Sequence, residues 1–122
     1  MATENTIQLK LKRGESKTLR LTITDASGTV VDLTGARVKM TVVEADTTSN
    51  VLFTKDSDVG VSEVEIATPT SGVADIFIEP SDTSGVTLYK FLYDIWVELA
   101  SGKRYAVVCP SKLFISETYT TF

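Results

Sequence analysis

The chain has 122 residues, 43% of them hydrophobic and 23% charged, which is the balance of one globular domain and excludes a disordered or collagen-like protein. Its 12 basic and 16 acidic residues give a net charge of −4, so nucleic acid is an unsuitable partner. With no histidine and one cysteine, the chain cannot form a His-dependent catalytic or zinc site or an internal disulfide.

The residue pattern favours β-strands. The 18 Thr, 14 Val and 7 Ile are β-branched and fit a pleated surface better than a helix. In chain order, apolar residues alternating with polar ones predict strands at 7–11, 19–23, 38–42, 51–53, 64–66, 74–78, 89–97 and 105–115. Residues 44–62 carry the weakest pattern, and 56–62 are expected to form an exposed loop. Residues 82–85 are expected to form a turn or a single helical turn.

Seven to nine short strands without a 3.6-residue period predict an all-β antiparallel β-sandwich, with an open barrel as the alternative. We expect one domain over residues 1–122, with flexible termini at about 1–6 and 117–122. Tyr89 is expected to share one face of its strand with Phe91, Tyr93, Ile95 and Val97. In the last strand, Pro110 is expected at a bulge or an edge, and Cys109 as a small buried apolar group.

No catalytic, cofactor-binding or metal-binding site is predicted. The paired carboxylates Asp56 with Asp58 and Glu63 with Glu65 are expected to be solvated, not to act as a general acid and base. Residues 56–60 resemble a calcium loop, but the glycine falls one position early and no glutamate stands at position twelve. Replacing Asp56 and Asp58 by Asn is therefore expected to leave thermal stability unchanged.

Three aromatic residues are candidate partner-binding residues. Trp96 lies on the mixed face of its strand among charged neighbours, where it could anchor an interface or pack under a loop. Tyr119 and Phe122 lie in a Thr-rich tail that could add to an exposed sheet edge or simply fray.

The charges divide unevenly along the sequence. Residues 1–40 carry seven basic and four acidic groups, whereas residues 41–122 carry five basic and twelve acidic ones. Such a molecule could dock head to tail with copies of itself or with a second protein, although solvent-facing charges can also fall unevenly by chance. No basic leader with an apolar core opens the chain, and no apolar run is long enough to cross a membrane.

A series of turn motifs provides a family resemblance. In order, they are Leu11-Lys-Arg-Gly14-Glu-Ser, Leu21-Thr-Ile-Thr-Asp25-Ala-Ser-Gly28, Asp32-Leu-Thr-Gly35-Ala36, Thr70-Ser-Gly72-Val-Ala-Asp-Ile76, Ser81-Asp82-Thr83, Phe91-Leu-Tyr93-Asp94-Ile95, Ser101-Gly102 and Leu113-Phe-Ile115. Over about residues 7–116 this series resembles the N-terminal domain of phage baseplate upper proteins and related short phage tail proteins.

The resemblance implies an Ig-like β-sandwich that connects virion proteins and is not an enzyme. It implies turn positions for Gly14, Gly28, Gly35, Gly72 and Gly102. It further implies that Leu33 plugs one end of the sandwich and that Phe91, Tyr93 and Ile95 line its core.

The resemblance also implies a location and a set of partners. The protein is expected in the virion, after synthesis in the host bacterial cytoplasm, as a homo-oligomer or multi-copy component in contact with other virion proteins. Neither a membrane nor nucleic acid is an expected partner. The alternative functions are a capsid decoration or head-fibre protein and a carbohydrate- or host-surface-binding module.

Overall fold

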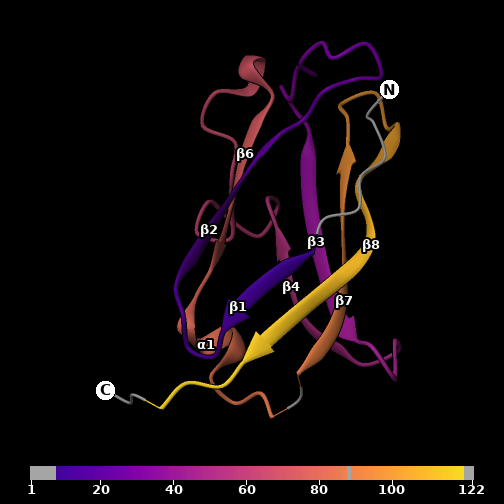
Figure 1. The fold of residues 1–122 in the computed structure, drawn as a ribbon. Helices are drawn as coiled ribbons and strands as arrows, with labels where there is room; N and C mark the ends of the chain where they lie inside the picture. The colour runs from indigo at the N-terminus through magenta and orange to yellow at the C-terminus, as the bar shows by residue number, and fades with distance from the viewer. Residues whose placement is uncertain (1–7, 88, 120–122) are drawn as a thin grey trace.

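Two β-sheets pack face to face in the computed structural model, which describes residues 8–87 and 89–119 (Figure 1). One sheet has five strands in the order β1-β8-β7-β3-β4, and the other has three in the order β2-β6-β5. The predicted all-β, Ig-like sandwich of seven to nine strands is confirmed. Residues 1–6 and 120–122, which include most of the expected flexible termini, lie outside the described residues.

The elements follow the predicted segments closely. The five-stranded sheet contains β1 (Leu9–Lys12), β3 (Arg37–Glu44), β4 (Val51–Asp56), β7 (Lys90–Glu98) and β8 (Arg104–Ser116). The three-stranded sheet contains β2 (Lys17–Thr22), β5 (Val64–Glu65) and β6 (Val73–Ile78). Two short helices complete the fold, η1 (Pro69–Ser71) and α1 (Pro80–Thr83). The helical turn expected at 82–85 therefore begins two residues earlier, at a proline suited to a first helical position.

One strand pair departs from the expected antiparallel arrangement. β1 runs parallel to β8, with Leu9 opposite Leu113 and Leu11 opposite Ile115. All other strand pairs are antiparallel. Parallel neighbours need a long crossover, and here nearly the whole chain lies between the two strands. Alternation in the sequence indicates which face a residue occupies but not the direction of its neighbour.

The predicted irregularity at Pro110 is confirmed, and it changes the environment of Cys109. The register between β7 and β8 shifts between the pair Tyr93–Ser111 and the pair Trp96–Ala106. Strict alternation fails at this shift, so Val107 and Val108 are both buried. Cys109 is only half-buried, and its prediction as a buried apolar group is wrong.

The core lies between the sheets, and its residues alternate with exposed ones along most strands. Phe91, Tyr93 and Ile95 line it as expected, and Leu33 is also buried, with its N–H bonded to Pro69 O at 2.9 Å. Tyr89 is an exception to the prediction: it lies before β7 begins and is 55% exposed. The five glycines expected in turns all have positive φ: Gly14, Gly28, Gly35, Gly72 and Gly102.

A buried ion pair joins the edge strand β4 to helix α1. Lys55 lies opposite the core residue Met40, and its Nζ is 2.7 Å from Asp82 Oδ2. The same carboxylate oxygen accepts the N–H of Glu79 at 2.8 Å. An inward-facing charge on an edge strand disfavours pairing with another sheet edge, because the charge would lose its partner if the strand rearranged.

We expect Lys55→Met to lower the free energy of unfolding by about 2 kcal/mol, because Asp82 would remain largely buried without its counter-ion. For a domain of this size, that lowers the melting temperature by about 6–8 °C, measurable by circular dichroism. The double variant Lys55→Met/Asp82→Asn removes both charges and should recover part of the loss. If the double variant is as unstable as the single one, the pair does not act as a unit.

Candidate partner-binding face

Trp96 is an exposed aromatic residue on the outer face of the five-stranded sheet. It lies on β7, opposite Lys39 of β3 and Ala106 of β8, and is 45% exposed. Its Nε1 donates a hydrogen bond to Asp94 Oδ2 at 3.1 Å, which fixes the orientation of the indole ring. The alternative that Trp96 packs under a loop is therefore wrong.

A shallow groove of about 440 Å³ lies beside this indole. Its lining comes from three adjacent strands and consists of Arg37, Lys39, Trp96, Val97, Glu98 and Arg104. The small side chain of Ala106 beside Trp96 leaves that flank of the ring uncovered. Because three paired strands hold the groove, it is already formed before any partner binds, and binding need not order it.

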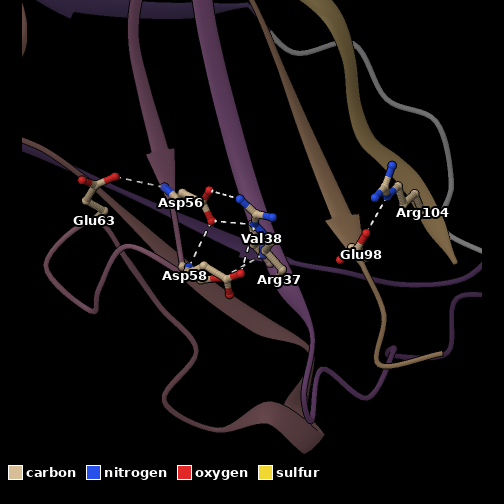
Figure 2. Close-up of polar contacts among 8 residues, drawn as sticks. Arg37, Val38, Asp56, Asp58, Glu63, Glu98 and Arg104 are labelled. Atoms are coloured by element: carbon tan, nitrogen blue, oxygen red, sulfur yellow. Dashed lines mark hydrogen bonds and ion pairs between the residues drawn. The ribbon is translucent and has the colours of Figure 1, made fainter. Parts of the chain in front are cut away.

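Ion pairs hold the charged walls of the groove (Figure 2). On one side, Arg104 Nε on β8 donates to Glu98 Oε2 on β7. On the other side, Arg37 on β3 makes a two-pronged contact with Asp56 on β4, with Nε to Oδ1 at 3.0 Å and an NH2 nitrogen to Oδ2 at 2.6 Å. These contacts leave the indole face as the main uncommitted surface of the groove.

Arg37 also occupies the space between the two carboxylates of the calcium-like loop. Its Nε lies 3.4 Å from Asp58 Oδ2, and Asp56 Oδ1 accepts the N–H of Asp58 at 3.0 Å. The hydrogen bonds from Arg37 lower the pKa of Asp56 below its ordinary value, and Asp56 in turn raises the pKa of Arg37. A guanidinium group thus provides the positive charge that a calcium ion would supply.

The structure corrects the prediction for Asp56. This residue ends β4 instead of lying in an exposed loop, its side chain is only 7% exposed, and its N–H donates to Glu63 Oε1 at 3.1 Å. Replacing it by Asn would remove a buried charge partner of Arg37, so for Asp56 the structure predicts a loss of thermal stability in place of the neutral effect expected from the sequence. Asp58, whose side chain is 64% exposed, fits the original expectation better.

A second aromatic patch lies at the other end of the same face. The Tyr89 ring packs against Phe114 of β8, with centroids 5.1 Å apart and planes inclined by 35°. A small hollow of about 150 Å³ beside Phe114 is lined in part by Leu92, Lys90 and Lys112. Aromatic groups therefore lie near both ends of the face, with lysines between them.

The outer face of the five-stranded sheet carries an excess of positive charge. Its seven basic side chains are Lys10, Lys12, Arg37, Lys39, Lys90, Arg104 and Lys112, and its three acidic ones are Asp56, Asp94 and Glu98. The other described residues include five basic and twelve acidic side chains. The chain is acidic as a whole, so this face differs in charge from the rest of the molecule.

The structure does not bring Trp96 and Tyr119 together. Tyr119 is 93% exposed and follows the end of β8, where Thr118 Oγ1 donates to Arg13 O at 3.1 Å. Trp96 lies beside the opposite end of β8. Phe122 falls outside the described residues. Sequence reasoning missed Arg37 and Lys39, although their alternation with buried Val38 and Met40 places them on an outer face.

A scan against protein-family models and a search of curated proteins find no match to this chain. Within residues 8–87 and 89–119, no group of three or more His, Cys, Asp or Glu side chains is placed to hold a metal ion. The same part of the chain contains no helix that is long and apolar enough to span a membrane.

Proposed function

We propose that this protein is a non-enzymatic structural component of a phage virion, an adaptor or connector in the tail or baseplate that binds other virion proteins. The observation that carries the proposal is the exposed Trp96, fixed by Asp94 beside a preformed groove on a basic sheet face. A tryptophan in such a position buries a large apolar area on association and is typical of interface hot spots.

The groove chemistry supports binding better than catalysis. Two of its charged walls are neutralised by ion pairs, Glu98 with Arg104 and Asp56 with Arg37. A general acid would need a carboxyl group with a raised pKa, but the pKa of Asp56 is lowered. The lysines around Trp96 favour a partner surface that presents carboxylates around an apolar pocket. The proposed location of the protein rests on its resemblance to phage baseplate proteins. It would be made in the cytoplasm of the host bacterium and then become part of the virion.

Two alternative functions use the same surface. As a capsid decoration or head-fibre protein, the chain would use this surface in the same way but would attach to the head of the particle and not to its tail or baseplate. A carbohydrate- or host-surface-binding module is favoured by one specific feature, an exposed indole beside the carboxylates of Asp94 and Glu98 and the guanidinium of Arg104. A sugar ring could stack on the indole and form hydrogen bonds with these groups.

Trp96→Ala tests the proposal in particles. In a phage from which the gene has been deleted, wild-type or variant protein is supplied from a plasmid, and its copies per particle are counted by quantitative mass spectrometry. We expect Trp96→Ala to weaken attachment at least tenfold, because truncating a hot-spot tryptophan typically costs 2 kcal/mol or more. The melting temperature should stay within about 2 °C of wild type, because the ring is half exposed.

The matched control is Thr18→Ala, which shortens an exposed side chain on the outer face of the other sheet. It should be incorporated like the wild type.

Tyr119→Ala tests the tail in the same assay. Normal incorporation of Trp96→Ala would contradict a role for this face in assembly. Normal incorporation combined with lost binding on a glycan array would favour the carbohydrate-binding alternative.

A further inference from the structure

The two sides of the sandwich differ in charge. On one side, the edge strands β1 and β2 are joined by the short turn 13–16, and Lys17 Nζ donates to Lys10 O at 3.4 Å. On the other side, the edge strands β4 and β5 are joined by residues 57–63, and the N–H of Asp56 donates to Glu63. Three strands separate β1 from β4 in the five-stranded sheet, so the two sides lie about 19 Å apart.

The basic edge, defined as residues 9–17, has a surplus of three positive charges. It contains Lys10, Lys12, Arg13 and Lys17 against the single acidic residue Glu15. Lys10 and Lys12 are exposed, and Lys17 is half-buried. No ion pair within the described part of the chain neutralises these three lysines. Their charge is therefore available to an incoming partner.

The acidic edge, defined as residues 51–65, has a surplus of three negative charges. It contains Asp56, Asp58, Glu63 and Glu65 against Lys55, which is already paired with Asp82. Three valines here are also exposed: Val51 by 55%, Val59 by 69% and Val61 by 70%. Because Arg37 pairs mainly with Asp56, the surplus negative charge comes from Asp58, Glu63 and Glu65. Exposed apolar side chains next to surplus carboxylates are typical of an interface, where the apolar groups supply burial and the charges set orientation.

The outer side of β4 faces no other described strand, although the N–H of Asp56 is already bonded to the Glu63 side chain. The N–H of Asp56 points away from β3, since it donates to Glu63. Because backbone direction alternates along a strand, Thr54 also turns its N–H and C=O groups away from β3, whereas the register shift at Leu52 breaks the alternation. No described strand lies on that side of β4. β1 is likewise an edge strand, with β8 as its one neighbour in the described residues.

We propose that copies of this chain associate side by side, the basic edge of one copy against the acidic edge of the next. The surplus charges of the two edges are equal and opposite, so the contact is electrostatic and does not require β4 to pair with another sheet edge. The two contacting surfaces differ, so the interface is heterologous and either closes into a ring or extends as a filament. This deepens the proposed multi-copy function by naming a second copy as partner. It uses a surface other than the Trp96 groove, so the two proposals can fail separately.

Sedimentation velocity on the purified chain tests this arrangement. Strand edges of four and six residues form a small contact, so we expect weak association, with Kd of about 10–100 μM in low salt. The wild type should form a concentration-dependent series that extends beyond the dimer. Because the contact is between exposed charges, 0.5 M NaCl, at a Debye length of roughly 4 Å, should weaken the association at least tenfold.

Charge reversal identifies the surfaces. Lys10→Glu/Lys12→Glu removes the basic edge, and Asp58→Lys/Glu65→Lys removes the acidic edge. Each variant alone should be monomeric, because both of its edges then carry charge of the same sign. An equimolar mixture should associate again in a series that extends beyond the dimer, because every contact then joins a basic edge to an acidic one. A chain carrying all four substitutions regains complementary edges and should associate again. Circular dichroism melts on each variant establish that it is folded before it is compared.

The matched control is Lys90→Glu/Lys112→Glu, which reverses two charges on the outer sheet face, on β7 and β8 and outside both defined edges. It should associate like the wild type. If this control is monomeric while the edge variants still associate, the contact lies on the Trp96 face and the proposal is wrong. It is equally wrong if the wild type stays monomeric at about 1 mM in low salt, or if the equimolar mixture contains no dimers.

Discussion

Replacing Gly72 by alanine is expected to lower the melting temperature by about 10–15 °C, corresponding to about 3–4 kcal/mol of unfolding free energy. Gly72 follows η1 with φ of +70°, a left-handed conformation that disfavours any Cβ. A Cβ built there would lie 3.0 Å from both Ile23 O and Val31 O. Both oxygens belong to the backbone, and Ile23 O is held by a hydrogen bond from Val31 N–H, so neither can move without shifting the chain.

The hydrogen bonds around Gly72 show what the substitution would disturb. Gly72 O accepts the N–H of Ile23 at 2.8 Å, and Ile23 O accepts the N–H of Val31 at 2.9 Å. Gly72 therefore lies where the start of β6 passes directly against the 23–31 hairpin. Thermal unfolding followed by circular dichroism measures the loss.

Gly28→Ala separates the two causes of that loss. Gly28 has a similar positive φ of +88°, but nothing lies within 4 Å of a Cβ built there. It should therefore cost only the conformational term, about 1 kcal/mol. If both alanine variants lose the same stability, the backbone does not approach Gly72 as closely as the structure indicates.

Local patterns predicted the strands because alternate residues of a half-buried strand face the core and the solvent, so the sequence itself alternates between apolar and polar residues. The alternation of Val38, Met40 and Val42 with polar residues indicates both the strand and its buried face, whatever its neighbours are. The same holds for the turn glycines, where each positive φ is a local requirement. These predictions needed no knowledge of which strands pair.

Features that depend on distant partners could not be predicted in this way. Asp56 is predicted in an exposed loop and Lys55 falls in the stretch with the weakest pattern, because two adjacent charges carry no apolar signal. They are buried only because Asp82 and Arg37, remote in sequence, neutralise them. The parallel pairing of β1 with β8 is also a relation between chain ends. Neither the ion pairs with remote residues nor the direction of strand pairing can be predicted from a local sequence pattern.

The candidate site was predictable in part for the same reason. Trp96 stood out because it alternates with buried Ile95 and Val97 among charged neighbours, a pattern confined to its own strand. The positively charged outer face on which Trp96 lies combines residues of β1, β3, β7 and β8. It emerges only from the strand order, although the positive surplus of residues 1–40 was a partial signal.

Replacing Arg37 by methionine is expected to lower the melting temperature at pH 7 by roughly 5–10 °C. Asp56 would then be a buried carboxylate without its two-pronged partner, beside Asp58 and Glu63. Methionine preserves most of the side-chain length, so the loss reports the charge and not a cavity. Lys39→Met is the matched control, since it removes a positive charge two residues away that has no ion pair among the described residues. It should change the melting temperature by no more than about 2 °C.

The pH dependence identifies Asp56 as the linked group. In the wild type the pKa of Asp56 is lowered below 3.8, so its contribution to stability is present above about pH 4 and is lost as pH falls through the lowered pKa. Without Arg37, the largest cause that lowers this pKa is lost and the pKa of Asp56 should move back toward its ordinary value, so the variant loses less stability on acidification than the wild type. The gap between their melting temperatures should therefore narrow steadily from pH 7 to pH 3. A gap that stays constant over this range would mean that Arg37 stabilises the edge through packing, with no role for the Asp56 charge.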